Sequence, residues 1–579
     1  MQKKALFGTL ALLALAGVVF ALNLYPRDSR LPTVRPVTDS MLGDAAGSGD
    51  WLTYGRDYAN QRFAPFTQIN RQTIQRLEPL WRQGPRRLLK SYLRTESTPV
   101  VVDGMLIYTD PGMRVARPGN HVIAVDLRTG RALWSWYHGP SNTALCCGLV
   151  NRGVALHGNK VYVGTLDARL VALDRRTGKV VWDQQVAGAD PAQGYSFTMA
   201  PLAAGGKIII GTSGGEFGIR GFLDAYDPET GRRLWRFYTI PSPEEGGWWG
   251  RLSLTTPAGD RLPRDTALER RDSARYADTW KRGGGPVWTT PAYDPELGLV
   301  IFGIGNPSGV DGRTPPGDNL YTVSLAALDV ATGKLRWYYQ MVPHDEWDYD
   351  PASPPVLLEV PHDGTSVPAV AQAGKTGWVY ILDRRSGKLL RRSQPFVPIE
   401  NIFSAATAAG VRIAPGTRGG SNWPSTAYSP ETGALYVLGS HIPMLRKVDS
   451  AATANARAKR PDLPPHHVLS TFTEVKNSGR FGTFTAVDAT TGRLRWQHKV
   501  KTPLMQGGAL ATAGGLVFFP EPPYLNALDA ETGKPVWRHE LDKGSKGALG
   551  PPITFMVDGR QRVAITSVSG VTVFGLRGD

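Results

Sequence analysis

Cysteine is nearly absent from this sequence, and its scarcity excludes whole classes of protein. The 579 residues include only two cysteines, Cys146 and Cys147, and these are adjacent. A framework of disulfides is therefore excluded, as is a C-x-x-C-H site for covalent attachment of haem. The sequence also lacks a stripe of basic residues interleaved with aromatic residues, although its formal net charge is +16. We therefore expect an acidic partner or an anionic membrane surface rather than nucleic acid.

The first residues have the composition of a targeting segment. Lys3 and Lys4 precede an apolar run over residues 5–22, which is at the lower limit of what spans a bilayer. This pattern is typical of a secretory signal peptide, or of an uncleaved membrane anchor with its positive end in the cytoplasm. We expect residues 1–30 to be one of these two, with residues 5–22 as the membrane segment, and the rest of the chain to lie in the periplasm.

A short motif recurs seven times along the chain. It consists of an apolar pair, Asp, two variable residues, Thr or Ser, Gly, and usually Trp four residues after the Gly. The aspartates are Asp126, Asp174, Asp227, Asp329, Asp383, Asp488 and Asp529, and the tryptophans are Trp134, Trp182, Trp235, Trp337, Trp496 and Trp537. The copy at Asp383 has Arg391 instead. The Asp caps a turn, the Gly supplies a positive φ, and the next strand carries the Trp toward a neighbouring unit.

Alternating β-rich stretches precede the motif, for example at residues 160–164 and 207–211, so that each unit holds about four strands. Radial repetition of four-stranded sheets is typical of a β-propeller. Two gaps between motif copies, Asp227 to Asp329 and Asp383 to Asp488, are about twice as long as the others. Because residues 241–285 and 441–475 are rich in Pro, Gly and charge, we interpret both gaps as insertions.

The end of the chain supplies strands for one more unit, at residues 563–566 and 571–574. This unit does not reach its own Asp-Thr-Gly turn, and we expect its missing strand near residues 77–81. The sequence therefore predicts an all-β, eight-bladed propeller with tryptophan-docking repeats over residues 31–579. Repeats alone are equally compatible with a non-catalytic propeller scaffold.

The adjacent cysteines are either two thiols or a vicinal disulfide. Their Cα atoms are held about 2.9–3.8 Å apart by one peptide bond, closer than in an ordinary disulfide, so the ring would be strained. Residues 146–155 (CCGLVNRGVA) resemble the vicinal-disulfide segment of the quinoprotein alcohol and methanol dehydrogenases, and the similarity extends from about Trp51 to the C-terminus. The resemblance implies that Cys146 and Cys147 form a disulfide, which lies over one face of the cofactor pyrroloquinoline quinone (PQQ). It also implies that Arg152 contacts PQQ.

Further segments extend this resemblance to a metal site. A turn at residues 212–221 carries Glu216 at its centre, and its small residues let the backbone approach a planar ligand. Alone, Glu216 and the Asn306 of segment 304–307 would be interpreted as turn residues. By resemblance both bind the metal ion, and Trp288 of segment 283–288 forms the other stacking face of PQQ.

The strongest resemblance lies at residues 343–350, where carboxylates surround an aromatic pair. Asp348 corresponds to the catalytic aspartate of the family and is also expected at the metal, together with Asp350. The calcium-dependent methanol dehydrogenases tend to have a small uncharged residue at the latter position, whereas the lanthanide-dependent ones have Asp. A trivalent ion gains more than Ca²⁺ from an added carboxylate. The quinoprotein glucose dehydrogenases share this pattern without lanthanide, so both lanthanide(III) and Ca²⁺ stay open.

Weaker motifs imply further contacts with PQQ. These are Glu96, Thr198, Ser213, Gly214, Gly215, Lys375, Asn422 and Trp423. Lys375 stands where the methanol dehydrogenases have Arg, and it can donate to the quinone oxygens only as a point charge. Gln506 stands where they have Trp, so the substrate pocket departs from the methanol type.

The resemblance implies an enzyme that oxidises an alcohol to an aldehyde by hydride transfer to metal-bound PQQ, with Asp348 removing the hydroxyl proton. Electrons would pass to a c-type cytochrome, or to ubiquinone if the chain stays at the membrane. Lys375, Asn422, Trp423 and Gln506 favour a second hypothesis, a dehydrogenase of aldoses or polyols. The insertions at 241–285 and 395–480 are where we expect loops to shape the pocket.

Overall fold

The computed structural model describes residues 33–44, 47–84, 95–110, 119–140, 144–145, 147–186, 188–309, 314–459, 469–475, 479–541 and 547–578. Residues 1–30, for which we predict a signal peptide or an anchor, lie outside these ranges, and so does Cys146 of the predicted disulfide. In the ranges described, every helix is too short or too polar to cross a membrane.

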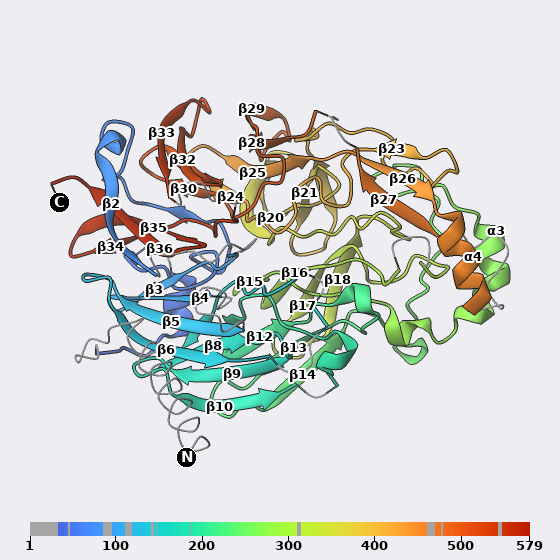
Figure 1. Cartoon of the computed structure of the whole chain (residues 1–579), viewed down its shortest axis with the longest axis horizontal. Coiled ribbons are helices and arrows are strands. Elements are labelled where there is room, and N and C mark those ends of the chain that lie inside the picture. The colour runs from blue at the N-terminus through green and yellow to red at the C-terminus, as the bar shows by residue number, and fades with distance from the viewer. Residues whose placement is uncertain are drawn as a thin grey trace, which may run out of the picture.

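Most of the described strands form eight antiparallel four-stranded units that follow one another around the molecule (Figure 1), and one of these units gains a fifth, parallel strand, β1 (Phe63–Ala64). We number them blades 1 to 8. Blade 1 comprises β3 (Val100–Val102), β4 (Met105–Asp110), β5 (Asn120–Asp126) and β6 (Ala132–His138). Blade 2 comprises β7 (Ala155–His157), β8 (Lys160–Gly164), β9 (Arg169–Asp174) and β10 (Val180–Gln185). Blade 3 comprises β11 (Leu202–Ala204), β12 (Lys207–Gly211), β13 (Phe222–Tyr226) and β14 (Arg233–Tyr238). Blade 4 comprises β15 (Ala292–Asp294), β16 (Leu299–Ile304), β17 (Ser324–Asp329) and β18 (Leu335–Gln340).

The second half of the ring has the same plan. Blade 5 comprises β19 (Val356–His362), β20 (Thr365–Ala373), β21 (Val379–Asp383) and β22 (Leu389–Arg392). Blade 6 comprises β24 (Ala427–Ser429), β25 (Ala434–His441), β28 (Phe481–Asp488) and β29 (Leu494–Val500). Blade 7 comprises β30 (Leu510–Thr512), β31 (Leu516–Glu521), β32 (Tyr524–Asp529) and β33 (Pro535–Glu540). Blade 8 comprises β34 (Ile553–Val557), β35 (Arg560–Ser567), β36 (Gly570–Leu576) and β2 (Leu77–Gln83). The predicted all-β propeller is confirmed, and this topology agrees with eight blades.

Blade 8 combines strands from both ends of the described chain. Strand β2 pairs antiparallel with β36, with Leu77 opposite Leu576 and Trp81 opposite Val573. This is the strand expected near residues 77–81, and it is the fourth strand of its blade, the position that carries the docking tryptophan elsewhere. Trp81 therefore supplies the indole that precedes the turn at Asp126.

The tryptophans of six blades dock onto the turn of the next blade. In these blades the indole nitrogen donates to a backbone oxygen in that turn: Trp81 to Leu127, Trp134 to Arg175, Trp182 to Pro228, Trp235 to Val330, Trp337 to Arg384 and Trp496 to Ala530, over 2.9–3.1 Å. The indole ring also packs against the turn glycine. Blade 5, which carries Arg391, departs from the rule, because a Cβ at Gly492 of the next turn would meet the backbone of Ser393 instead.

We expect Gly178→Ala to destabilise the protein by about 2–4 kcal/mol, since it combines backbone strain with overpacking. Gly178 has φ +70, and a Cβ there would lie 2.5 Å from the ring of Trp134. Gly104→Ala is the matched control, because Gly104 has φ +73 and nothing within 4 Å. Urea denaturation of both variants should therefore give a clearly larger loss for Gly178→Ala, and equal losses would contradict the docking role of Trp134.

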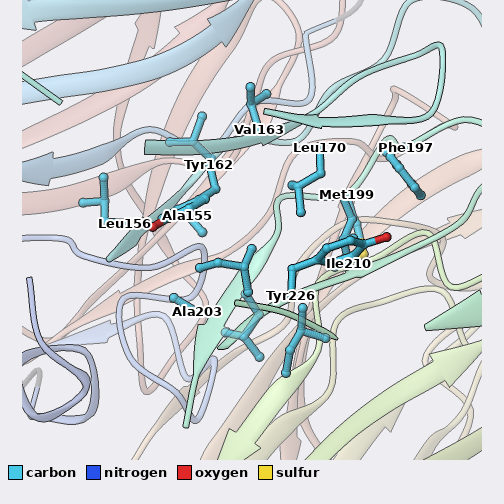
Figure 2. Close-up of a cluster of buried hydrophobic side chains, with 14 of the residues drawn as sticks. Ala155, Leu156, Tyr162, Val163, Leu170, Phe197, Met199, Ala203, Ile210 and Tyr226 are labelled. Carbon is cyan, nitrogen blue, oxygen red and sulfur yellow. The ribbon is translucent and has the colours of Figure 1, made fainter. Parts of the chain in front are cut away.

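Apolar side chains fill the space between neighbouring blades. Figure 2 shows Tyr162, Val163 and Leu170 of blade 2 near Met199 and Ile210 of blade 3. All of these side chains are buried. The burial of both faces of each sheet explains why β8 and β12 read as continuous apolar runs in the sequence.

An N-terminal segment crosses the first strands of four blades. The carbonyl groups of Tyr58, Ala59, Gln61 and Arg62 accept from the backbone of Tyr293, Leu357, Tyr428 and Ala511, in blades 4, 5, 6 and 7, over 2.8–3.0 Å. Strand β1 (Phe63–Ala64) then runs parallel to β30. The helix α2 (Asp39–Gly43) and the short helix η1 (Ile74–Arg76) flank this segment. Local sequence patterns did not predict this segment.

Both doubled gaps hold insertions rather than further blades among the described residues. The first, before β15, contains η5 (Pro243–Glu245), α3 (Thr266–Asp272), η6 (Ser273–Tyr276) and η7 (Thr279–Arg282). The second, between β25 and β28, contains β26 (Met444–Val448), α4 (Ser450–Lys459) and β27 (Ser470–Glu474). Strand β23 (Val411–Ile413) completes a separate three-stranded sheet with β26 and β27. Figure 1 shows α3 and α4 at the same edge of the molecule.

Candidate active site

A cavity of about 360 Å³ lies where the first strands of the blades begin. Seven blades contribute residues that just precede their first strand: Glu96, Arg152, Thr198, Trp288, Asp348, Trp423 and Gln506. Blades 3, 4 and 5 add residues that just follow their second strand: Ser213, Asn306 and Lys375. Since neighbouring strands run antiparallel, the start of the first strand and the end of the second strand lie at the same end of each blade. The repeat therefore gathers residues from most of the chain into one site.

The cavity unites nearly all of the predicted site residues. Its lining includes Glu96, Cys147, Arg152, Thr198, Ser213, Gly214, Glu216, Trp288, Asn306, Asp348, Asp350, Lys375, Asn422 and Trp423. Gly215 lies directly behind, since a Cβ there would be 3.3 Å from Oδ1 of Asn306. Cys146 is outside the described residues, so the disulfide stays a prediction.

Six further lining residues were not singled out from the sequence. These are Val150, Pro286, Thr417, Arg418, Leu504 and Met505. Each lies shortly before the first strand of blade 2, 4, 6 or 7, so the position within the repeat was the signal that could have found them. Arg418 and Cys147 are exposed, so they lie nearer the solvent. Arg152 and Lys375 are buried. Arg418 is ion-paired with Glu474 of β27 at 2.6 Å.

Asp348 and Asp350 share one cation, the ammonium group of Lys375. Nζ of Lys375 lies 2.8 Å from Oδ2 of Asp348 and 3.2 Å from Oδ2 of Asp350. Oδ1 of each aspartate is buried and has no hydrogen-bond partner in the described part of the structure. Two carboxylates, each with one buried oxygen that lacks a partner there, thus lie side by side, which is unfavourable unless further positive charge is bound.

The two carboxylates meet because the chain turns at this point instead of continuing as a strand. Asp348 has φ +63, and the N–H of Lys375 donates to the carbonyl of Asp350 at 3.1 Å. The Asp345 carboxylate accepts from the N–H groups of Trp347 at 3.0 Å and Tyr349 at 3.2 Å, which stabilises the turn. Burial raises the pKa of Asp345 to about 7, although these two N–H groups favour its ionised form.

Charge and burial oppose each other among these groups. Burial raises the pKa of Asp348 well above its ordinary value; Lys375 opposes this shift, and the charges of Asp350 and Glu216 add to it. Burial alone would lower the pKa of Lys375, but Asp348 and Asp350 together raise it, so that the ammonium stays charged. A bound cation would favour the ionised form of Asp348 in the same way.

The donor set suits a hard cation that prefers oxygen ligands. Nδ2 of Asn306 donates to the carbonyl of Pro307 at 3.1 Å, which places Oδ1 on the other side of the amide. With Glu216, Asp348 and Asp350, three carboxylates and the Asn306 amide line the same cavity. Among the described residues no three His, Cys, Asp or Glu side chains converge as a metal site by themselves. Here Lys375 offsets only one of the two aspartate charges, and the two Oδ1 atoms without a hydrogen-bond partner among the described residues are what a metal ion would bind.

A second group of residues in the cavity suits a planar anion. The Arg152 guanidinium lies 2.6 Å from the Glu96 carboxylate and donates to Oγ1 of Thr198 at 2.9 Å. It also lies 4.8 Å from the ring centre of Trp288, a distance typical of cation–π contacts. The hydroxyls of Thr198 and Ser213 are 2.5 Å apart.

Glycine is required at position 214, where the backbone of blade 3 passes another loop. Gly214 has φ +106 and caps the short helix η4 (Gly215–Phe217), which carries Glu216. A Cβ at this position would lie 2.0 Å from the carbonyl oxygen of Gly194. The predicted small-residue turn is thus needed for close approach of two backbones, which in turn places Glu216 at the cavity.

Comparison with known proteins agrees with this geometry. The family described as glucose/ethanol/alcohol dehydrogenase, β-propeller domain, matches residues 51–399 and 389–563. The quinoprotein alcohol dehydrogenase PedH of Pseudomonas putida is 35% identical over 563 residues, covering 92% of this chain and 89% of that protein. The lanthanide-dependent methanol dehydrogenase of Methylacidiphilum fumariolicum is 32% identical, covering 98% of this chain and 91% of that protein.

Solved structures show the same likeness. A quinohemoprotein alcohol dehydrogenase from Comamonas testosteroni has a TM-score of 0.77 at 31% identity, covering 94% of this chain and 83% of that one. A europium-containing methanol dehydrogenase has a TM-score of 0.75 at 31% identity, covering 92% of each chain. The chain therefore belongs to the family of quinoprotein, PQQ-dependent alcohol and methanol dehydrogenases, and it is an enzyme of that class.

Proposed function

We propose that this protein oxidises a small alcohol to the aldehyde in the periplasm, using PQQ and one metal ion held in the cavity. The observation that carries the proposal is the pair of carboxylates Asp348 and Asp350, each with a buried oxygen that has no hydrogen-bond partner among the described residues. They lie in the same cavity as the Arg152 guanidinium and the Trp288 ring. The cavity thus combines groups that suit a cation with groups that suit a planar anionic quinone.

Each part of the cavity has a distinct task in this proposal. PQQ supplies a two-electron acceptor and the metal a Lewis acid when both are bound. Glu216, Asn306, Asp348 and Asp350 would hold the metal, and Arg152, Thr198, Ser213 and Trp288 would hold the quinone. The Asp348 carboxylate accepts the proton of the substrate hydroxyl, since it lines the cavity and keeps 23% of its side chain exposed there.

Lys375 orients this carboxylate. Lys375 is 5% exposed and its ammonium bonds Oδ2 of Asp348. It therefore restricts the Asp348 side chain to one position and favours the ionised form that a base requires. Leu504, Met505 and Trp423 give the cavity apolar walls that limit the access of water. Gln506 in the same wall leaves more room and a polar group, which favours an alcohol larger than methanol.

The second carboxylate favours a trivalent ion. Asp350 adds a negative charge next to Asp348, and the attraction between charges rises with the charge of the ion. A lanthanide(III) ion is therefore proposed ahead of Ca²⁺, in keeping with the name of the Methylacidiphilum relative.

We expect Asp350→Ala to weaken binding of La³⁺ about 10–100-fold and binding of Ca²⁺ by a smaller factor, with little change in folding. Both constants can be measured by titrating the PQQ-loaded protein with each ion. Asp294→Ala is the matched control, because Asp294 is equally buried and ion-paired with Arg384 but lies outside the cavity. If the Asp350 variant bound both ions as the wild type does, Asp350 would have no place at the metal.

A direct activity test separates this proposal from its rival, a dehydrogenase of aldoses or polyols. Purified protein loaded with PQQ and either La³⁺ or Ca²⁺ is assayed with an artificial electron acceptor on primary alcohols and on aldoses. We expect higher kcat/KM on alcohols and higher activity with La³⁺. Preference for aldoses would establish the rival function, which Gln506 and Lys375 favour. Absence of any PQQ-dependent activity would refute both.

Electrons leave to a separate partner in this proposal, because the sequence has no C-x-x-C-H site for a haem of its own. A c-type cytochrome is one such acceptor, and the net charge of +16 suits an acidic one. Ubiquinone is the other, if residues 5–22 anchor the chain to the membrane. Export through residues 1–30 would place both cysteines in an oxidising compartment, where the disulfide between Cys146 and Cys147 can form.

A further inference from the structure

The segment from His344 to Asp350 has an unusual backbone for residues that carry a Cβ. His344 has φ +53 and Asp348 has φ +63, both in the left-handed region that L-residues rarely adopt. Such conformations persist only where the surroundings impose them. The segment between them presents Asp348 and Asp350 to the cavity, so its supports decide where the two carboxylates lie.

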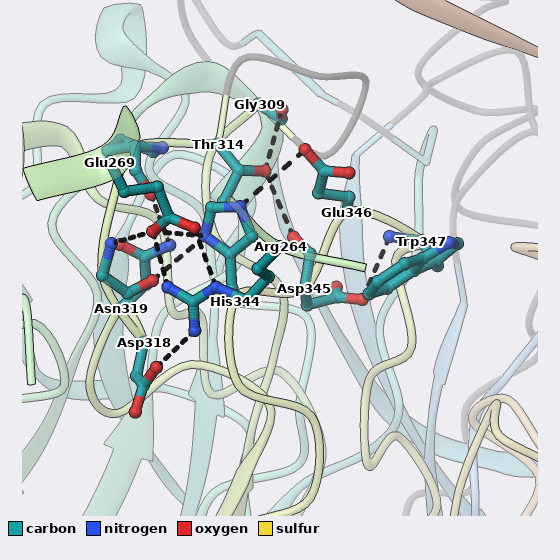
Figure 3. A network of polar contacts seen from close by, with 12 residues as sticks. Arg264, Glu269, Gly309, Thr314, Asp318, Asn319, His344, Asp345, Glu346 and Trp347 are labelled. Atoms are coloured by element: carbon teal, nitrogen blue, oxygen red, sulfur yellow. Dashed lines mark hydrogen bonds and ion pairs between the residues drawn. The ribbon is translucent and has the colours of Figure 1, made fainter. Parts of the chain in front are cut away.

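The first support comes from the insertion between blades 3 and 4. Arg264, whose side chain is 2% exposed, donates to the Glu269 carboxylate of α3 at 2.6 and 2.9 Å and to that of Asp318 at 2.5 Å. The carbonyl of Asp318 accepts from the N–H of His344, and the imidazole Nδ1 of His344 lies 3.0 Å from the carbonyl of Gly317. Figure 3 shows His344 between the carboxylates of Glu269 and Glu346.

The second support comes from the insertion within blade 6. Arg446 of β26 is also 2% exposed, and its guanidinium lies 2.9 Å from the Glu346 carboxylate. It donates to the carbonyl of Ser404 at 2.9 Å, the same oxygen that accepts from the indole of Trp347 at 2.9 Å. The guanidinium also lies 5.4 Å from the ring centre of Trp347. Arg446 thus holds the two residues that immediately precede Asp348.

We propose that Arg264 and Arg446, one from each insertion, are positioning residues that hold the His344–Asp350 turn so that Asp348 and Asp350 lie together at the cavity. Neither arginine lines the cavity, so each acts only through this turn. Both insertions, which are additions to the propeller plan, thereby serve the site. The proposal rests on the proposed function only for the consequence at the metal, because the conformation of the turn can be observed in protein without metal or PQQ.

The test measures hydrogen exchange of the backbone N–H groups of Trp347 and Tyr349 in the full-length protein free of metal and PQQ. In the wild type both donate to Asp345 and should exchange slowly. Arg446→Met keeps an apolar side chain but removes the donors to Glu346 and Ser404. We expect exchange at these two positions to accelerate at least tenfold, and Arg446→Lys to restore part of the protection. Arg264→Lys removes the planar guanidinium that donates to both Glu269 and Asp318. We expect it to accelerate exchange at the same positions.

A second measurement, titration with La³⁺ alone, examines the consequence at the metal. We expect Arg446→Met to weaken La³⁺ binding about tenfold, in the range found for groups that orient metal ligands. The matched control is Arg392→Met, since Arg392 also ties the first insertion to a blade, through Asp260, but does not touch the turn. It should leave exchange at Trp347 and Tyr349 unchanged.

The outcomes separate the two proposals. Wild-type exchange rates at Trp347 and Tyr349 in folded Arg446→Met, or in Arg264→Lys if the first variant does not fold, would refute the positioning role. Faster exchange in the variants together with no La³⁺ binding by the wild type would leave the positioning role intact and refute the metal site.

Discussion

Substitution of Asp348 by asparagine is expected to lower kcat about 10²–10⁴-fold, the range found when a positioned general base is removed. Asparagine has nearly the same shape and can keep one oxygen near Nζ of Lys375, which lies 2.8 Å from Oδ2 of Asp348. It cannot accept the proton of the substrate hydroxyl. The loss should therefore appear in kcat, while KM for the alcohol changes little.

The measurement is steady-state turnover with an artificial acceptor, at PQQ and metal concentrations that saturate both the wild type and the variant. Loading is verified from the absorbance of bound PQQ, so that lost binding is not mistaken for lost catalysis. Asp350→Asn serves as the comparison, because it removes the neighbouring charge but keeps Asp348. If Asp348→Asn retained more than a tenth of the wild-type kcat, Asp348 would not be the base.

The second large effect is expected at Arg62, which does not line the cavity. Its guanidinium is buried and donates to the carbonyl groups of Tyr54, Ala509 and Pro552 at 2.7–2.8 Å. Arg62→Met would leave these three buried acceptors without a donor, at a cost of about 1–3 kcal/mol each, partly offset by relaxation. We expect a loss of about 3–5 kcal/mol in the free energy of unfolding.

Chemical denaturation of the purified variant measures this loss. Arg128→Met is the matched control, since Arg128 also joins two blades, through Asp558, but both side chains are mostly exposed. Exposed ion pairs of this kind contribute about 0–1 kcal/mol. Comparable losses in the two variants would show that Arg62 does not organise the N-terminal segment.

Much of the fold could be predicted because the same local sequence pattern recurs in most blades. The Asp-x-x-Thr-Gly turn needs a capping carboxylate and a positive φ, and the tryptophan needs a partner in the next blade. Each copy of the motif can therefore be recognised by itself. Even the exception at Arg391 was visible, and the structure shows the next turn packing on Ser393 instead. Trp81 was not recognised as a docking tryptophan, because the other strands of its blade lie at the opposite end of the chain. The turn on which it docks, at Asp126, follows it in the sequence.

The site was predictable in composition but not in arrangement. Resemblance identified Asp348, Asp350 and Lys375, yet it did not indicate that the lysine would pair with both carboxylates. That pairing depends on a left-handed backbone at Asp348, which is imposed by Arg264 and Arg446 from distant segments. Contacts between residues so far apart in sequence leave no periodic signal, and the path of residues 51–64 across four blades was missed for the same reason.

Ring closure has a consequence for the order of events in folding. Strands β2 and β36 complete the same sheet, and the ion pair between Glu78 and Arg577 beside them joins residues 499 positions apart. During synthesis, β2 therefore cannot pair until β36, at Gly570–Leu576, has been made. Bringing such distant segments together is entropically costly, and it slows folding relative to a protein with local contacts. Until the ring closes, β2 and β36 have unpaired edges that can pair with other chains. The pairing of β36 with β2 therefore protects the protein from aggregation as well as closing its ring.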